Sequence, residues 1–214
     1  MDPEKIRNID RLIRRHMNGD TASLMRSRFV AYDKNYGLSL QHIRDLASMI
    51  PLSALDCDEL FQSRWREKMI LAVYALPAAG ATPQRLADWA TLIPCNELVD
   101  VAALALAHKV TDLPALTDIL LSRRLTFDCA FAFALCARSA DASQIEKSLL
   151  FAAFLESFSP ADCHGLKLLC RSAIRLSLSD SLVSSVSDIA IRQGSTHSLI
   201  LAEEIKTERD FLQG

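Results

Sequence analysis

The sequence predicts an all-α protein made of stacked helix pairs, a helical-repeat solenoid, and three observations lead to this fold class. Ala, Leu, Ser and Arg dominate its 214 residues, a composition that suits helices. Only six Gly and seven Pro occur, so long runs of helix formers stay uninterrupted. From residue 55 onward the predicted helix pairs start again every ~27–37 residues, which is typical of helical solenoids.

Three helices are predicted over the N-terminal residues 1–50. The first covers residues 3–17, with Asp2 as N-cap and Pro3 at its first position, and Asn18-Gly19 is expected to end it. A short helix from Thr21 to about 29 follows, and then a helix from about 40 to 50. Basic side chains line the polar face of the first helix, which either contacts phosphate or is simply solvated: Lys5, Arg7, Arg11, Arg14 and Arg15.

About five antiparallel helix pairs are expected over residues 55–213, so that 1–214 forms a single domain. Proline after a capping residue marks two of the boundaries, at Thr82-Pro83 and Ser159-Pro160, and Thr111 or Asp112 is expected to cap another helix. The predicted pairs are 55–62 with 64–76, 82–93 with 96–109, 112–122 with 126–139, 143–157 with 160–178, and 180–193 with 195–212.

Composition excludes several classes of protein. The net charge of −2 and a pI near 6.2 give no global case for nucleic acid, although a local basic face remains compatible with them. The six cysteines lack metal spacing, and two pairs lie seven residues apart along helices, too far for a disulfide. We therefore expect buried free thiols, no metal, no cofactor and a cytoplasmic protein without a membrane segment.

The helix predicted at 96–109 carries the one acid that suggests chemistry. Leu98 to Ala107 is apolar at every position except Asp100, so this helix is expected to be buried on most sides. Asn96 and Glu97 share a narrow polar face with Asp100. A carboxylate in such a place is either a functional acid or an ordinary acid in the first turns of a helix, where the macrodipole favours it.

The two tryptophans, Trp65 and Trp89, allow two interpretations. Each could stack on an exposed base. Each also has apolar residues at helical spacing, as Trp65 has Met69 and Val73, and aromatic residues in that pattern usually pack in the core. We therefore expect both tryptophans to be buried.

Basic residues outside the first helix form several small groups. Corresponding ends of successive helices in a solenoid line one concave surface, so these groups either share a groove that follows a phosphate backbone or only solubilise the surface. Arg123-Arg124 is expected in a loop between helices. The candidates for phosphate contact are Arg26, Arg28, Lys34, Arg123, Arg124, Arg171 and Arg175.

Two segments carry a family resemblance, LMRSRFVAYDKNYGLSLQHIRDLA and ELFQSRWREKMILAVYAL. Together they resemble the AlkD-like DNA alkylation-repair family. That resemblance implies HEAT-like repeats, duplex DNA held in a concave basic cleft, and excision of alkylated bases. The family's catalytic aspartate falls on Asp100. Its aromatic position falls on Asn96, its arginine near Ala130 and its later tryptophan near Leu176, so one of the four positions matches.

Two functions follow as hypotheses. The first is a DNA alkylation-repair-like protein that binds the DNA backbone, with Asp100 stabilising a cationic sugar and Asn96 and Glu97 lining the cleft. The second is a non-catalytic HEAT-like scaffold for a protein partner or an unusual nucleic-acid structure. The missing aromatic positions favour the second as a mechanism, because aromatic rings would shield a cationic base.

Overall fold

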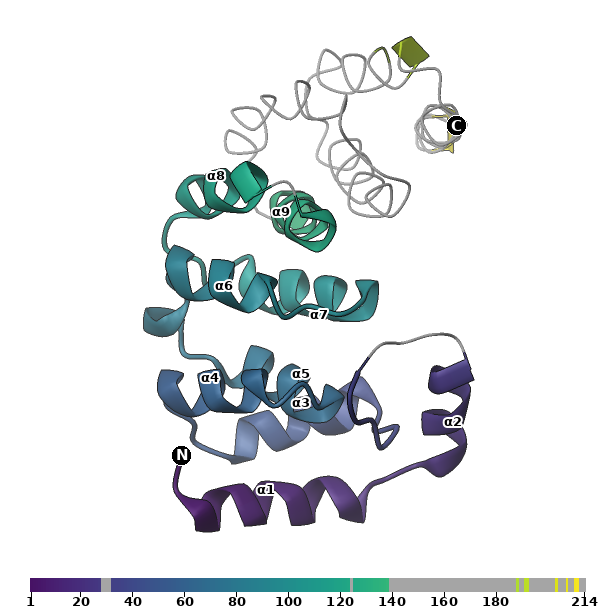
Figure 1. The fold of residues 1–214 in the computed structure, drawn as a ribbon, viewed down its shortest axis with the longest axis vertical. Helices are drawn as coiled ribbons and strands as arrows, with labels where there is room; N and C mark the ends of the chain where they lie inside the picture. The colour runs from purple at the N-terminus through teal and green to yellow at the C-terminus, as the bar shows by residue number, and fades with distance from the viewer. Residues whose placement is uncertain are drawn as a thin grey trace. The chain divides into compact units, whose positions relative to one another are not determined.

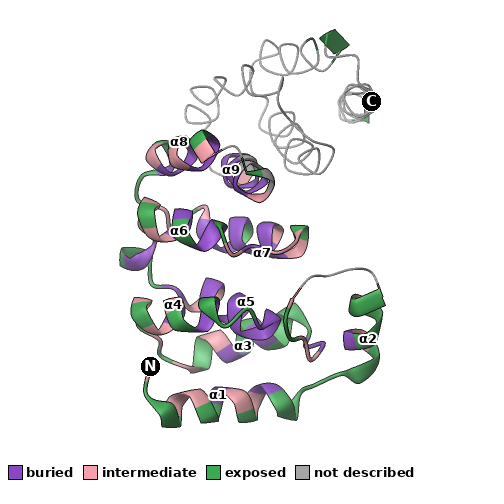
Figure 2. Cartoon of the chain, in the orientation of Figure 1, coloured by how far each residue is buried: buried purple, intermediate pink, exposed green. Residues whose placement is uncertain are grey.

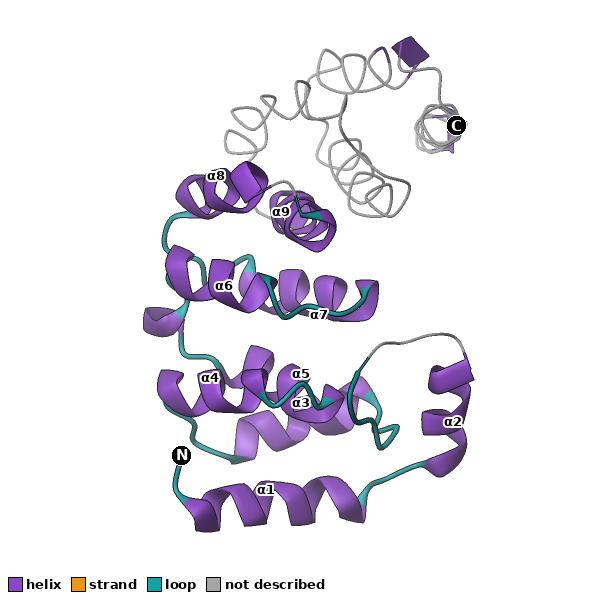
Figure 3. Ribbon diagram, viewed as in Figure 1, coloured by secondary structure: helices purple, strands orange, loops and turns teal. Residues whose placement is uncertain are grey.

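The computed structural model describes residues 1–27, 32–123 and 125–138, together with isolated positions between 188 and 211 (Figure 1). The chain forms two compact units, Met1–Thr111 (unit 1) and Asp112–Gly214 (unit 2). Throughout these described ranges the regular structure is helical, which confirms the all-α prediction (Figure 3). The elements of unit 1 are α1 (Pro3–Arg15), α2 (Gly19–Ser27), α3 (Leu40–Met49), α4 (Ala54–Gln62), α5 (Arg66–Ala75), the 3-10 turn η1 (Ala78–Gly80), α6 (Pro83–Ala90) and α7 (Asn96–Leu106). Unit 2 contributes α8 (Leu113–Arg123) and α9 (Thr126–Arg138).

Local capping sets where several helices begin. The Asp2 carboxylate accepts a hydrogen bond from the Glu4 amide, and Pro3 opens α1 as predicted. Thr82 caps α6 in the same way through the Arg85 amide, and Asp112 accepts from the Ala115 amide at the start of α8. These positions were readable from the sequence because the cap and its partner lie within three residues of each other.

Two local predictions were wrong. Asn18-Gly19 does not end the first helix but starts the second, since the Asn18 side chain accepts a hydrogen bond from the Thr21 amide at 3.0 Å. Arg123 is not in a loop, because α8 continues to that residue. In both cases the helix signal was correct and its boundary moved by a few residues, as helix ends commonly do.

Helix pairs recur at a regular interval along the described chain. In unit 1, α4 packs against α5, and the next two helices, α6 and α7, pack on α4 and α5 respectively, while α8 and α9 pack together in unit 2. The first helices of these pairs begin at Ala54, Pro83 and Leu113, steps of 29 and 30 residues. Helices therefore occur at the first three predicted pairs. The pairs predicted from residue 143 onward lie outside the continuously described residues.

The core of unit 1 is centred on α5, which packs against α3, α4 and α7 (Figure 2). Met69 through Val73 are fully buried, so α5 is covered on every side over that stretch. Trp65 and Trp89 are also buried, as predicted, and Trp89 stacks on Phe61 with the ring centroids 4.3 Å apart. Neither indole is therefore free to stack on a base.

Cys57 and Cys95 are thiols outside any disulfide. Cys57 and Cys136 are buried, as predicted, whereas Cys95 is only half-buried. Burial raises the pKa of the Cys57 thiol to about 12. This thiol therefore stays protonated near neutral pH and behaves as a small apolar side chain.

Polar side chains connect the α4–α5 pair to α6 and to the end of α7. The Asp58 carboxylate of α4 accepts hydrogen bonds from the Arg85 guanidinium at 3.0 and 3.1 Å and from the Trp89 indole at 2.8 Å. Beyond α7, the Lys109 ammonium donates to the backbone carbonyls of Tyr74 and Leu76 at the end of α5. These contacts fix the second pair against the first.

Candidate nucleic-acid interface

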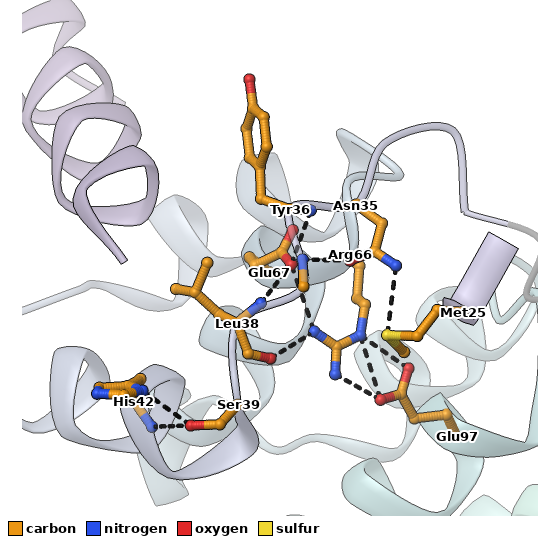
Figure 4. A network of polar contacts seen from close by, with 10 residues as sticks. Met25, Asn35, Tyr36, Leu38, Ser39, His42, Arg66, Glu67 and Glu97 are labelled. Atoms are coloured by element: carbon orange, nitrogen blue, oxygen red, sulfur yellow. Dashed lines mark hydrogen bonds and ion pairs between the residues drawn. The ribbon is translucent and has the colours of Figure 1, made fainter. Parts of the chain in front are cut away.

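A buried arginine at the start of α5 organises the surroundings of the candidate site (Figure 4). The Arg66 guanidinium donates from Nε to both carboxylate oxygens of Glu97, at 3.2 and 3.0 Å, and from Nη2 to Oε1 at 2.6 Å. Its Nη1 donates to the Leu38 carbonyl at 2.8 Å. Burial lowers the pKa of Arg66, but the Glu97 and Glu67 carboxylates outweigh burial and raise it overall. The side chain is therefore a permanent buried cation.

The neighbouring Glu67 holds the chain that leads into α3. Its carboxylate is fully buried, and Oε1 accepts hydrogen bonds from the backbone amides of Tyr36 at 3.0 Å and Leu38 at 3.4 Å. The backbone of this segment also pairs with the connection between α4 and α5, since the Arg66 amide donates to the Lys34 carbonyl at 2.9 Å. Residues 33–38 are thereby fixed to the start of α5.

A sharp turn at Gly37 shapes the same segment. Gly37 has φ of +73°, and its amide donates to the Asn35 side chain at 2.8 Å. A Cβ at this position would lie 2.3 Å from the Asn18 carbonyl oxygen, so only glycine allows the turn to approach the connection between α1 and α2 this closely. The turn brings the segment around Lys34 next to α2.

A cavity of about 290 Å³ lies between α2 and residues 32–36. Arg26 and Lys34, both predicted to contact phosphate, are exposed side chains on its wall. The Lys34 ammonium sits 4.4 Å from the centroid of the Trp65 ring, and a second cation, Lys68, sits 4.3 Å from that ring. The described residues that line it are Met17, Gly19, Ala22, Arg26, Tyr32, Asp33, Lys34, Asn35 and Tyr36, and we call this the α2 cavity.

The electrostatics of the α2 cavity are predominantly cationic. Asp33 is the one carboxylate among its lining residues, and it lies 3.5 Å from the Arg64 guanidinium. Burial, together with the Glu97 carboxylate, raises the pKa of the Tyr32 hydroxyl, so Tyr32 adds no negative charge near neutral pH. The cavity therefore offers two exposed cations beside the uncharged phenol of Tyr32.

The predicted acid and its neighbours lie on α7. Glu97, predicted to line a cleft, directs its carboxylate to Arg66. Asn96 is exposed, Asp100 is half-buried, and Leu104, one turn further, has 63% of its surface exposed. Positions 96, 100 and 104 thus form the outward stripe of an otherwise buried helix. Asp100 does not line the α2 cavity and remains the predicted catalytic acid.

Among the other predicted phosphate contacts, the structure describes Arg123. Arg123 belongs to unit 2, where its Nη1 lies 3.6 Å from the buried Asp128 carboxylate. Desolvation raises the pKa of Asp128 despite this pairing. The remaining candidates lie outside the described residues: Arg28, Arg124, Arg171 and Arg175.

The sequence reasoning missed the ion network of Arg66, Glu67 and Glu97 as a unit. Arg66 and Glu67 stand directly before an apolar run with no polar face, which was a signal that both charges would be buried. Nothing in the sequence pointed from Arg66 to Glu97, 31 residues away.

The described ranges contain neither a metal-binding cluster nor a membrane-spanning helix. No three His, Cys, Asp or Glu side chains gather there in a way that would hold a metal ion. None of the helices described is both long enough and apolar enough to cross a membrane.

Comparison with known proteins gives a likeness of fold. No family model matches the sequence, and no curated protein matches it. Among solved structures, one matches over 88% of this chain and 83% of its own, with a TM-score of 0.71 and 13% sequence identity. It is described as a new family of proteins related to the HEAT-like repeat DNA glycosylases, with affinity for branched DNA structures. The fold is therefore HEAT-like, which confirms at the level of fold the resemblance seen in the sequence.

Proposed function

We propose that this protein binds DNA through the sugar–phosphate backbone and binds branched DNA more tightly than linear duplex. The α2 cavity carries the proposal, because Arg26 on α2 and Lys34 in residues 32–36 both line it. The solved structure of the same fold is described as having affinity for branched DNA, which supports the choice of ligand. Both side chains are exposed, so a backbone phosphate can reach them.

The proposed contact is electrostatic and independent of base sequence. Arginine and lysine that neutralise phosphates release condensed counterions, so affinity falls steeply as salt rises. The Lys34 ammonium is held near Trp65 and Tyr36 by cation–π contact, which limits its freedom before DNA arrives. The net charge of −2 means that binding has to come from such local groups rather than from the whole chain.

Changing Arg26→Gln and Lys34→Gln together is expected to weaken binding to a four-way DNA junction by about tenfold at moderate salt. Loss of two phosphate contacts should also reduce the slope of log affinity against log salt by about 1.8. Fluorescence anisotropy at four salt concentrations measures both quantities. The pair Arg26→Lys with Lys34→Arg keeps both charges and serves as the matched control, which we expect to bind nearly as the wild type does.

The outcome that contradicts the proposal is equally direct. Absence of salt-sensitive binding of the wild-type protein to any DNA would remove the nucleic-acid function and leave a helical scaffold for a protein partner. Binding that is unchanged in the double variant would move the interface away from the α2 cavity.

Excision of an alkylated base is a second candidate function. The observation that favours it is the half-buried carboxylate of Asp100 within the otherwise apolar stretch from Leu98 to Ala107. Such a carboxylate would stabilise the positive charge that develops on the sugar and would orient the attacking water. The buried indoles of Trp65 and Trp89 cannot shield a cationic base, so recognition would depend on charge alone.

Asp100→Asn is expected to lower release of 7-methylguanine from alkylated DNA by roughly a hundredfold if Asp100 is the catalytic acid. The reason is that the amide keeps the shape of the side chain and loses its charge. Asp45→Asn on α3 removes an exposed carboxylate and is the control. Equal release by wild type and Asp100→Asn would rule out the acid's role, and no release by the wild type would leave DNA binding without excision.

A further inference from the structure

The outer face of α1 carries an unusual concentration of arginine. Ile9 and Ile13 are buried and attach this helix to the rest of unit 1. Four arginines on the opposite side of the helix are exposed, and Figure 2 shows exposed positions along α1. They line an open groove of about 440 Å³ together with Asp10. These four side chains are Arg7, Arg11, Arg14 and Arg15, and we call this surface the α1 arginine face.

Two of the other charges of α1 are paired with the rest of unit 1, and Glu4 in the first turn is exposed, so cations outnumber anions on the outward surface of this helix. Lys5 lies 2.8 Å from the Asp56 carboxylate, and Asp10 lies 2.6 Å from the Lys68 ammonium. Within the described part of the chain, none of the four guanidinium groups has a carboxylate at ion-pair distance. Asp10 is therefore directed to Lys68 although it borders the groove.

The spacing of the arginines suits a phosphate backbone. Arg7, Arg11 and Arg15 follow each other at four-residue intervals, which places their Cα atoms about 6 Å apart along the helix axis. A DNA strand carries a phosphate every ~3.4 Å of its axis, so neighbouring arginines can reach nearby phosphates of one strand. The guanidinium fork also matches phosphate geometry better than an ammonium does.

The same spacing costs stability in the free protein. Like charges four residues apart on a helix repel each other and destabilise it modestly. A face that served only for solubility would mix both signs of charge. An anion bound along the groove would remove this repulsion, so the arrangement favours a ligand of repeating negative charge.

We infer that the α1 arginine face holds the phosphate backbone of a second DNA arm while the α2 cavity holds the first. The inference rests on the proposed DNA binding. The described residues that line the two surfaces do not overlap, since those of the groove lie on α1 and those of the cavity lie on the α1–α2 connection, α2 and residues 32–36. A branched DNA offers two duplex arms at one place, which a single linear duplex does not.

The test replaces Arg7, Arg11 and Arg15 with Gln in the full chain. Affinity for a four-way junction should fall by at least about tenfold, and affinity for a linear duplex of the same length by less than about threefold. The salt slope on the junction should decrease by about 2.7, as expected for three lost phosphate contacts. All three side chains are exposed, so the melting temperature should not fall, and circular dichroism checks this point.

The control variant replaces the same three arginines with Lys and keeps the charge. We expect it to retain most of the junction affinity, because a phosphate also accepts contacts from an ammonium. Equal losses on junction and duplex, or no loss on either, would overturn the inference while leaving DNA binding intact. If wild type binds vesicles containing phosphatidylserine and only that binding is lost in the Gln variant, the face serves a membrane, and the inference is also wrong. Failure of the wild type to bind any DNA would instead remove the proposed function itself.

Discussion

Arg66→Met is expected to lower the free energy of unfolding by about 3–5 kcal/mol, the usual cost of removing one partner from a buried ion pair. The fully buried carboxylate of Glu67 and the partly buried one of Glu97 would then repel each other without the cation that now lies between them. The Leu38 carbonyl would also lose the hydrogen bond from Nη1. Urea denaturation followed by circular dichroism measures the change.

A compensated variant separates the cost of unpaired charge from the value of the ion pair. Arg66→Met combined with Glu67→Gln and Glu97→Gln should recover a large part of the loss, because neutral amides tolerate burial better than carboxylates. The side-chain amide introduced by Glu67→Gln can still accept, through its oxygen, the hydrogen bonds from the backbone amides of Tyr36 and Leu38. A loss below about 1 kcal/mol for Arg66→Met alone would show that solvent reaches the network freely.

Gly37→Ala should destabilise the protein by at least about 3 kcal/mol. The left-handed backbone conformation alone costs roughly 1–2 kcal/mol for a residue with a Cβ. The added atom would also lie 2.3 Å from the Asn18 carbonyl oxygen and 2.7 Å from the Ala22 nitrogen, and both are backbone atoms that cannot rotate away. Thermal and urea unfolding measure the loss.

Gly19→Ala provides the matched control for this substitution. Gly19 begins α2, and a Cβ added there would meet no neighbouring atom within 4 Å, so alanine should be neutral or stabilise by up to about 1 kcal/mol. If both glycine variants behave alike, the close approach at Gly37 does not hold the α2 cavity in shape. We expect the Gly37 variant to bind DNA more weakly as well, because the cavity wall includes residues 32–36.

The fold was predictable where its signals are local. Asp2 before Pro3 and Thr82 before Pro83 specify helix starts within a single turn, so no knowledge of the tertiary structure was needed. The orientation of α7 was predictable only in part. Asn96 and Asp100 do mark its outward side, but the apolar residues further along the helix do not show that Leu104 continues that side while Ala103 is buried.

The candidate site was predictable in its residue types and less so in its geometry. Arg26 and Lys34 were recognisable as basic residues, but the turn at Gly37 is what brings them to one cavity. Glu97 was expected beside a cleft, whereas its partner Arg66 lies 31 residues earlier and no local rule connects them. Contacts between helix pairs depend on how the pairs stack, and the residues that make them lie far apart in the sequence, so no short sequence pattern reveals them.

The α4–α5 pair of unit 1 contains charged groups that have ion-pair partners in the following pair. Asp58 relies on Arg85 and Trp89, and Arg66 relies on Glu97. Solenoids with purely apolar joints can gain or lose a module in evolution at little cost, because any interface fits any other. Here such an indel would strand a charge at the new joint, so the number of modules is under electrostatic constraint and lineages should differ in sequence more readily than in repeat number.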